Sequence, residues 1–151
     1  MDKFLTLLAQ QKTNISAAAG IIAGCISSVT GGWTAGMTAL VTCMIVDYIM
    51  GIVVAAHFNN SPKSEHGGLN SQVGWKGLTR KVFTMCLVVV AHQIDVVAGT
   101  AFFRDAMVVG FFVNELISIA ENAGLMGIHM PAVFDKAIDI LQKKGEDGQD
   151  E

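Results

Sequence analysis

The residues best suited to chemistry in this sequence are acidic and histidine side chains inside apolar stretches. Asp47 lies near the middle of the run MIVDYIMGIVVAAHF (44–58), and His92 and Asp95 lie one helical turn apart in a later run. A third polar group follows along the chain: Asn114, Glu115, Ser118, Glu121 and Asn122. An ionised carboxylate in hydrocarbon is costly, so we expect these side chains to face protein or water rather than lipid.

Two interpretations of these polar side chains stay open. In the first, protonated and hydrogen-bonded carboxyl groups lie inside a static helical bundle; in the second, they line a water-filled lumen. No Lys or Arg occurs inside the apolar runs that carry the acids, so the sequence predicts that only a protonated His92 would neutralise them.

The sequence does not indicate an enzyme. It has no nucleophile–base pair and no phosphate-binding glycine loop. His92 and Asp95 offer two metal ligands on one face, but no further His or Cys set completes a metal site, and no cofactor is expected. The three cysteines, Cys25, Cys43 and Cys86, lie inside apolar runs without a CxxC pair, and no basic patch with interleaved aromatic residues indicates nucleic acid.

The composition indicates a membrane protein that must position these side chains on helices. Of 151 residues, 52% are hydrophobic and 15% are charged, whereas soluble domains average about 25% charged residues. The mean hydropathy is +0.49. Apolar stretches cover residues 14–30, 35–57, 82–103 and 106–120, the last of them short and polar in part. The predicted fold is therefore all-α, with three to four transmembrane helices and a C-terminal amphipathic helix.

Charge placement predicts the orientation of these spans. A polar loop at 58–81 carries Lys63, Lys76, Arg80 and Lys81 against one acid, Glu65. Short loops rich in Lys and Arg stay in the cytoplasm. We therefore expect a multi-pass protein with a cytoplasmic N-terminal segment at 1–13, a transmembrane domain at 14–123 and a cytoplasmic C-terminus.

The C-terminal part is expected to differ from the spans. Phe134, Ala137, Ile138 and Leu141 recur at helical spacing after Pro131, which predicts an amphipathic helix within residues 124–144. Residues 145–151 read as a disordered acidic tail.

Small residues form two seams at helical spacing. The first seam is Ser16, Gly20, Gly24 and Ser28; the second is Ala39, Cys43, Gly51 and Ala55, with Asp47 at its centre. Because lipid supplies little hydrophobic drive between helices, close approach along small residues is a main route to association. Four short helices offer too few partners for these seams within one chain, so the sequence predicts a homo-oligomer in the lipid bilayer.

Three segments together resemble the bacteriophage holin family, which includes clostridial toxin-secretion holins. They are VDYIMGIVVA (46–55), GWKGLTRK (74–81) and NELISIAENAGLMGIHMP (114–131), and the similarity extends over roughly residues 40–140. The residues that match the family motif are Asp47, Tyr48, Gly51, Gly77, Lys81, Asn114, Glu115, Ser118, Glu121, Asn122, Gly127 and Pro131.

The resemblance implies a small protein of the bacterial host's inner, cytoplasmic membrane. Such proteins assemble into large holes that release a cytoplasmic cell-wall hydrolase (endolysin) or a large toxin and cause host lysis, without a stable complex between hole and cargo. Many holins have a second start methionine a few residues in; here the next methionine after Met1 is Met37. The sequence leaves two alternatives, a small homo-oligomeric ion or proton channel using Asp47, Asp95 and Glu115, and a structural subunit of another membrane protein.

Overall fold

The regular structure of this protein is helical throughout the residues that the computed structural model describes, 2–58, 68 and 70–147. This confirms the predicted all-α class. The described chain divides into two compact units, Met1–Trp33 and Thr34–Glu151, which are treated separately below.

The first unit is a single long helix, α1 (Asp2–Val29). It ends where Gly31 and Gly32 adopt positive φ angles of 75° and 102°, a conformation that glycine adopts without steric cost. The Gly32 N–H donates to the Ser27 carbonyl oxygen at 2.7 Å, which satisfies a helix-end acceptor.

The second unit begins with α2 (Ala35–Val53), which continues as one π-helical turn, η1 (Val54–Phe58). The Thr34 hydroxyl caps α2 by accepting the Met37 N–H at 3.3 Å. The buried positions recur at mean spacings near 3.5 residues: Met37, Leu40, Met44, Asp47 and Val54. One face of this helix therefore packs inside the bundle, and the carboxylate of Asp47 belongs to that face.

Helices α3 (Ser71–Ala98) and α4 (Phe102–Leu125) form a tight antiparallel hairpin. The Asn70 side chain caps α3 by accepting the Gln72 N–H at 2.9 Å. Gly99 ends α3 in the left-handed conformation, with φ of 71°. Helix α5 (Ala132–Asp147) follows Pro131, whose fixed φ suits the start of a helix.

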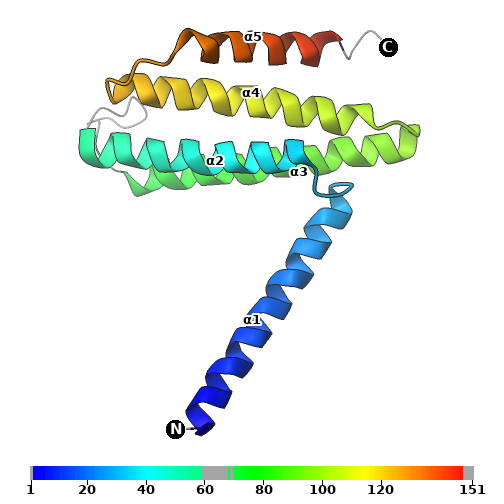
Figure 1. The fold of residues 1–151 in the computed structure, drawn as a ribbon. Helices are drawn as coiled ribbons and strands as arrows, with labels where there is room; N and C mark the ends of the chain where they lie inside the picture. Colours follow the sequence, from blue (N-terminus) through cyan, green and yellow to red (C-terminus); the bar gives the residue numbers. More distant parts are fainter. Residues whose placement is uncertain (1, 59–67, 69, 148–151) are drawn as a thin grey trace. The chain divides into compact units, whose positions relative to one another are not determined.

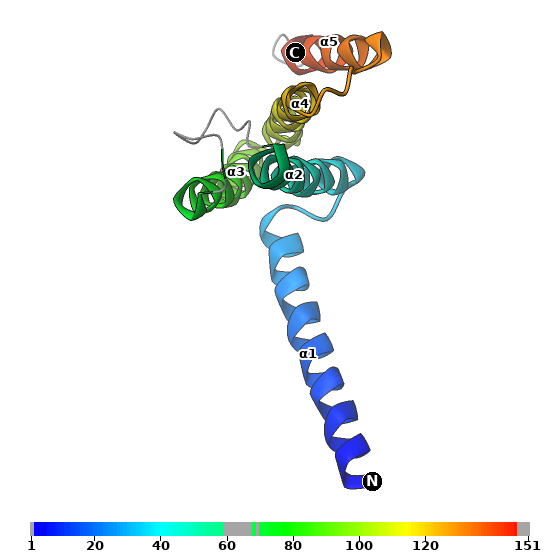
Figure 2. The same ribbon diagram turned by 90° about the vertical axis from the view of Figure 1, so that its left-hand side faces the viewer.

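Helices α2, α3 and α5 of this unit all pack against α4. In Figure 1, α2 and α4 run in the same direction, and α3 and α5 run in the opposite direction. Figure 2 shows α5 on the opposite side of α4 from α2 and α3. Helix α4 is thus the central element that contacts each of the other three.

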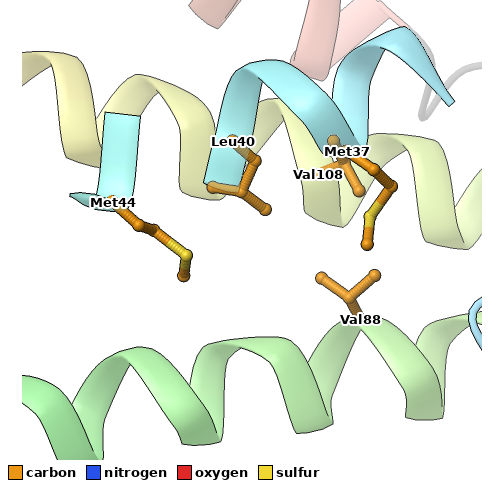
Figure 3. Packing of buried hydrophobic residues seen from close by; sticks show 5 residues of the cluster. All are labelled: Met37, Leu40, Met44, Val88 and Val108. Atoms are coloured by element: carbon orange, nitrogen blue, oxygen red, sulfur yellow. The ribbon is translucent and has the colours of Figure 1, made fainter. Parts of the chain in front are cut away.

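The apolar core lies where α2, α3 and α4 meet, at the end of the bundle that holds the start of α2. Figure 3 shows its side chains, which come from all three helices: Met37, Leu40 and Met44 from α2, Val88 from α3 and Val108 from α4. A Cβ atom on Gly36 would lie 3.2 Å from Val108 Cγ1, so α2 and α4 approach closely there.

Two helical segments of the described chain are long and apolar enough to cross a membrane, Ala35–Phe58 and Ser71–Ala98, with mean hydropathies of 2.2 and 1.6. Only 28% and 17% of their apolar windows are buried, whereas the core helix of a soluble protein would be mostly covered. The predicted stretches at 14–30 and 106–120 are not among these segments. The structure thus supports two of the three to four predicted spans.

Several predicted boundaries shift. The stretch predicted at 82–103 crosses a turn, since α3 ends at Ala98 and α4 begins at Phe102. Helix α3 begins at Ser71, so Lys76, Arg80 and Lys81 lie on a helix rather than in the predicted loop 58–81, and Lys63 lies outside the described residues. The N-cap at Asn70 explains the early start of α3. The C-terminal helix extends to Asp147, three residues into the predicted tail, whose last residues, 148–151, also lie outside the description.

Candidate functional site

Asp47, the acid in the middle of the second apolar stretch, is buried by other residues of the same chain. It is 8% exposed and lies midway along the segment Ala35–Phe58, on the face that packs against α3 and α4. Its neighbours on this face are the core residues Met44 and Leu40. A carboxylate here has exchanged water for protein contacts, and it needs partners from the neighbouring helices.

Lys81 of α3 supplies the charge partner. Its Nζ donates to Asp47 Oδ2 at 2.8 Å and to Glu115 Oε2 of α4 at 2.5 Å. All three side chains are at most 15% exposed. The prediction that no Lys or Arg would neutralise the acids was wrong, because the residues directly before Val82 form the first part of helix α3 and not a loop.

Asn122 of α4 completes the group. Its Nδ2 donates to Asp47 Oδ1 at 2.9 Å and lies 3.4 Å from the backbone carbonyl oxygen of Asp47. A Cβ on Gly51 would lie 4.0 Å from the same Nδ2, so the glycine leaves room for the amide. We name Asp47, Lys81, Glu115 and Asn122 the ion cluster.

The ion cluster joins three helices by charge. With both acids ionised, its net charge is −1. Burial of charges removes their hydration, and only good geometry and further hydrogen bonds repay that cost. Removing one partner from such a group leaves an uncompensated buried charge, which costs about 3–5 kcal/mol. The cluster therefore favours one arrangement of α2, α3 and α4 strongly over arrangements that separate the charges without hydrating them.

Tyr48 sits beside the ion cluster on the α3 side. A Cβ on Gly74 would lie 3.7 Å from the Tyr48 hydroxyl oxygen, and one on Gly77 would lie 3.9 Å from ring atom Cε2. The two glycines, one helical turn apart, thus form a flat surface against which the tyrosine ring lies. Together Tyr48, Gly51 and Gly77 bring three more of the motif residues to this site.

Asp95 has a different role from the one expected of a polar-face residue. It is 3% exposed, and its carboxylate accepts the Thr100 hydroxyl at 2.6 Å and the Phe103 and Arg104 N–H groups at 2.9 and 2.8 Å. Asp95 thereby caps the start of α4 from the end of α3, where the N-cap residue Ala101 has no side-chain hydrogen bond of its own. It fixes the hairpin and does not join the ion cluster.

The other predicted polar-face residues are spread over the bundle. His92 and Ser118 are half-buried, and within the described residues neither has a side-chain hydrogen bond or ion pair. Asn114 and Glu121 are exposed on α4. Among the described residues, no three His, Cys, Asp or Glu side chains are grouped as metal ligands would be.

The two small-residue seams have different surroundings. On α1, Ser16, Gly20, Gly24 and Ser28 are all exposed, and a Cβ on either glycine would meet no atom within 4 Å. On α2, Ala39, Cys43 and Gly51 are half-buried and Ala55 is 8% exposed, covered within the same unit. The α2 seam is thus partly used inside the chain, while the α1 seam remains open.

Sequence reasoning assigned Lys81 to the basic loop and named Tyr48 through the family motif alone, so it did not place either side chain beside the acids. A signal for Lys81 was present: Asn70-Ser71 is a helix start, which places Lys81 ten residues into a helix. No pattern in the sequence could show that its ammonium group reaches two acids that lie 34 residues away on either side.

Several known proteins are similar in sequence to this chain over most of its length. The sequence profile of the bacteriophage holin family matches residues 24–143. An uncharacterized protein of Halalkalibacterium halodurans (BH0965) is 41% identical over 111 residues, 70% of this chain and 75% of the relative. An uncharacterized protein of Listeria monocytogenes (Lmo0128) is 39% identical over 105 residues, covering 68% and 69% of the two chains.

A further relative carries a functional name. The probable holin of Bacillus phage phi105 is 30% identical over 103 residues, 68% of this chain and 70% of the phage protein. No solved structure matches the chain significantly.

Proposed function

The chain belongs to the bacteriophage holin family, and we propose that it acts as a holin in the inner membrane of a bacterial host. Copies of the chain assemble in the bilayer and open large holes. Through these holes a cytoplasmic endolysin, or a large toxin, leaves the cytoplasm, and the host lyses. The cargo passes through the hole and forms no stable complex with it.

The surface of the second unit supports a lipid-facing side. Large apolar side chains are exposed along α2 and α3: Ile45, Ile49 and Ile52 on α2, and Val82, Phe83, Val90 and Val97 on α3. Monomeric soluble proteins rarely expose contiguous apolar surface of this extent. In a bilayer these side chains lie against acyl chains, so α2 and α3 cross the membrane in this proposal.

Helix α5, on the opposite side of the bundle, carries more polar side chains. Its exposed residues include Asp135, Lys136 and Asp139, beside the apolar Val133 and Ile140. Because α5 lies across α4 from α2 and α3 (Figure 2), these polar side chains belong to a helix on the other side of α4 from the exposed apolar residues of α2 and α3. A subunit with these two sides suits the wall of a water-filled hole. Helix α4 packs on both apolar helices, so we place it in the membrane as well; its polar side chains explain its lower hydropathy.

The ion cluster supplies a closed arrangement that precedes the hole. While Lys81 is paired with Asp47 and Glu115, the three charged groups are held together inside a single subunit. Opening requires that these groups become hydrated, which a lumen shared by many copies provides. Moving one charge through 100 mV is worth about 2.3 kcal/mol, so loss of the membrane potential is a suitable trigger.

The orientation follows from the positive-inside rule. Lys76 and Arg80 lie near the start of α3. With the start of α3 at the cytoplasmic end and α1 as a further crossing, the N-terminus is cytoplasmic. Because α5 runs back along α4 (Figure 1), a cytoplasmic C-terminus requires that α5 leaves α4 and lies on the inner membrane surface. The open small-residue seam of α1 is then available for contacts between copies.

Beyond the family, one observation carries the proposal. Lys81 is paired with both Asp47 and Glu115 inside the bundle, and it thereby joins three helices whose outer surface is apolar. The test uses bacteria that hold an endolysin in the cytoplasm, in which this chain is induced. A holin gives abrupt lysis after a delay, and liposomes that contain the purified chain release an enzyme-sized cargo. Release of ions without the enzyme would identify the narrow ion or proton channel instead.

A further inference from the structure

A pocket of about 530 Å³ lies beside the ion cluster, at the end of the bundle where η1 ends and α3 begins. Small-molecule sites in proteins have volumes of about 300–1,000 Å³, so the pocket is large enough for a ligand. Its walls come from three elements, α2 with η1, the first half of α3 and the end of α4. Ile52, Val73 and Leu125 give it apolar surface.

The charged groups that the described residues bring to the pocket do not balance. Asp47 and Lys81 of the ion cluster reach its lining, and Glu121 of α4 adds a second carboxylate. Lys81 is also paired with Glu115. Among the described residues, these three acids and one lysine carry a net charge of −2 when all are ionised.

Hydrogen-bond acceptors also outnumber donors there. The Lys81 ammonium donates to Asp47 and Glu115, and the Asn122 amide nitrogen donates to Asp47. Within the described residues, no side chain or backbone donor reaches the Glu121 carboxylate or the Asn122 carbonyl oxygen. Asn122 is 6% exposed and lines the pocket. A buried acceptor without a partner is costly, so a donor from a ligand would be favoured.

We infer that this pocket binds a small organic cation, an ammonium group attached to an apolar body. The ammonium donates to Glu121 and the Asn122 carbonyl oxygen, and the aromatic ring of Tyr48 at the pocket wall adds a cation–π attraction. The apolar body contacts Ile52, Val73 and Leu125. A soluble amine and the ethanolamine headgroup of a lipid share this chemistry. The inference concerns binding alone and does not depend on hole formation.

The first experiment titrates the purified full chain, in micelles of an uncharged detergent, with 2-phenylethylammonium and separately with neutral 2-phenylethanol, by isothermal titration calorimetry. The cation is expected to bind saturably at one site per chain and the alcohol is not. Equal binding of the two compounds, or no binding of the cation, would overturn the inference.

Two variants place the ligand in this pocket. Glu121→Gln is expected to weaken binding of the cation by about tenfold, equivalent to about 1.4 kcal/mol, while Asp139→Asn on the exposed surface of α5 leaves it unchanged. Gly124 lines the pocket, and a Cβ there would meet no atom within 4 Å. Gly124→Leu should therefore fill the pocket and abolish binding with helicity retained. Unchanged affinity in both pocket variants would show that the cation binds elsewhere.

The lipid source is tested in nanodiscs. In discs of phosphatidylethanolamine, competition by the headgroup should raise the apparent Kd of 2-phenylethylammonium above that in discs of phosphatidylcholine, which has the same net charge but no N–H donor, if the ethanolamine headgroup is the natural occupant. Equal affinity in the two lipids would assign the pocket to a soluble amine. Because all of these readouts are binding constants, they remain informative even if the chain proves unable to open holes.

Discussion

The two ends of the same three-helix contact are held together by different forces. At one end, Leu40, Val88 and Val108 pack as apolar side chains; toward the other end, Lys81 pairs with Asp47 and Glu115. In a bilayer the apolar end gains little from burial, because lipid tails are as apolar as the core. At the ionic end, the charged side chains would be far less stable if they faced lipid instead of one another. The difference indicates that the ion cluster, not the apolar core, decides which arrangement the helices adopt.

The strongest way to break this comparison is to remove the one cation of the ion cluster. Lys81→Met leaves two buried carboxylates without a charge partner and should lower the free energy of unfolding by about 3–5 kcal/mol. In bacteria that hold an endolysin, the closed arrangement should then be lost, and lysis should come markedly earlier than with the unaltered chain. The measurements are unfolding in mixed detergent micelles and the lysis time after induction.

The control for that variant lies on the same helix. Lys76→Met removes an exposed lysine five residues earlier, outside the ion cluster. It should leave stability and lysis time nearly unchanged. Equal effects of the two variants at equal protein levels would show that loss of positive charge, and not loss of the buried pair, is responsible.

An intermediate effect is expected at the apolar end. Leu40 is fully buried, and Leu40→Ala should cost about 2 kcal/mol, at the low end of the range for buried leucines, because lipid or neighbouring side chains can fill the space. The informative quantity is the difference between the losses of unfolding free energy caused by Leu40→Ala and by Lys81→Met. An unfolding free energy reduced more by Leu40→Ala than by Lys81→Met would reverse the comparison.

A smaller effect is expected at the α3–α4 hairpin. Asp95→Ala removes the cap of α4 and should cost about 1–2 kcal/mol, typical of lost helix caps, with no change in the ion cluster. Unfolding in mixed micelles measures the loss, and amide hydrogen exchange at Phe103 and Arg104 should rise, since their N–H groups lose their acceptor. Unchanged exchange at these two amides would contradict the capping role.

The smallest effect on stability is expected at Val97, on the side of α3 that we propose faces lipid. Val97 is 89% exposed on α3, and Val97→Ala should change stability by less than about 0.5 kcal/mol. A spin label placed at this position should report contact with acyl chains in the bilayer. A label that instead reports water would place α3 elsewhere in the assembly.

The helices themselves were largely predictable, since apolar stretches mark α2 and the second half of α3, although the start of α3 at Ser71 was not predicted. The face that α2 buries was only half predicted. Reading every fourth residue selects Ala39 and Cys43, which are half-buried, whereas the packed face follows a spacing near 3.5 through Leu40, Met44 and Asp47. Because a helical turn has about 3.6 residues, positions exactly four apart move gradually around the helix and off the packed face. Asp47 belongs to both patterns.

The partners of the acids were not predictable from their own surroundings. Lys81 looked like part of a basic loop because it follows a polar segment, and tertiary packing of α3 against α2 and α4 brings it inward. Asp95 looked like a pore residue, but the left-handed turn at Gly99 returns the chain so that the start of α4 reaches its carboxylate. Both outcomes depend on contacts between segments that no single stretch of sequence contains.

The central claim is that Lys81 and Glu115 form a buried pair that holds the closed bundle. The most direct test compares lysis times of Lys81→Glu, Glu115→Lys and the double variant that carries both changes. We expect each single variant to alter lysis time strongly and the charge-swapped double variant to return most of the way to the unaltered delay. If the double variant lyses as abnormally as the sum of the two singles, the two side chains are not partners in the membrane and this account is contradicted.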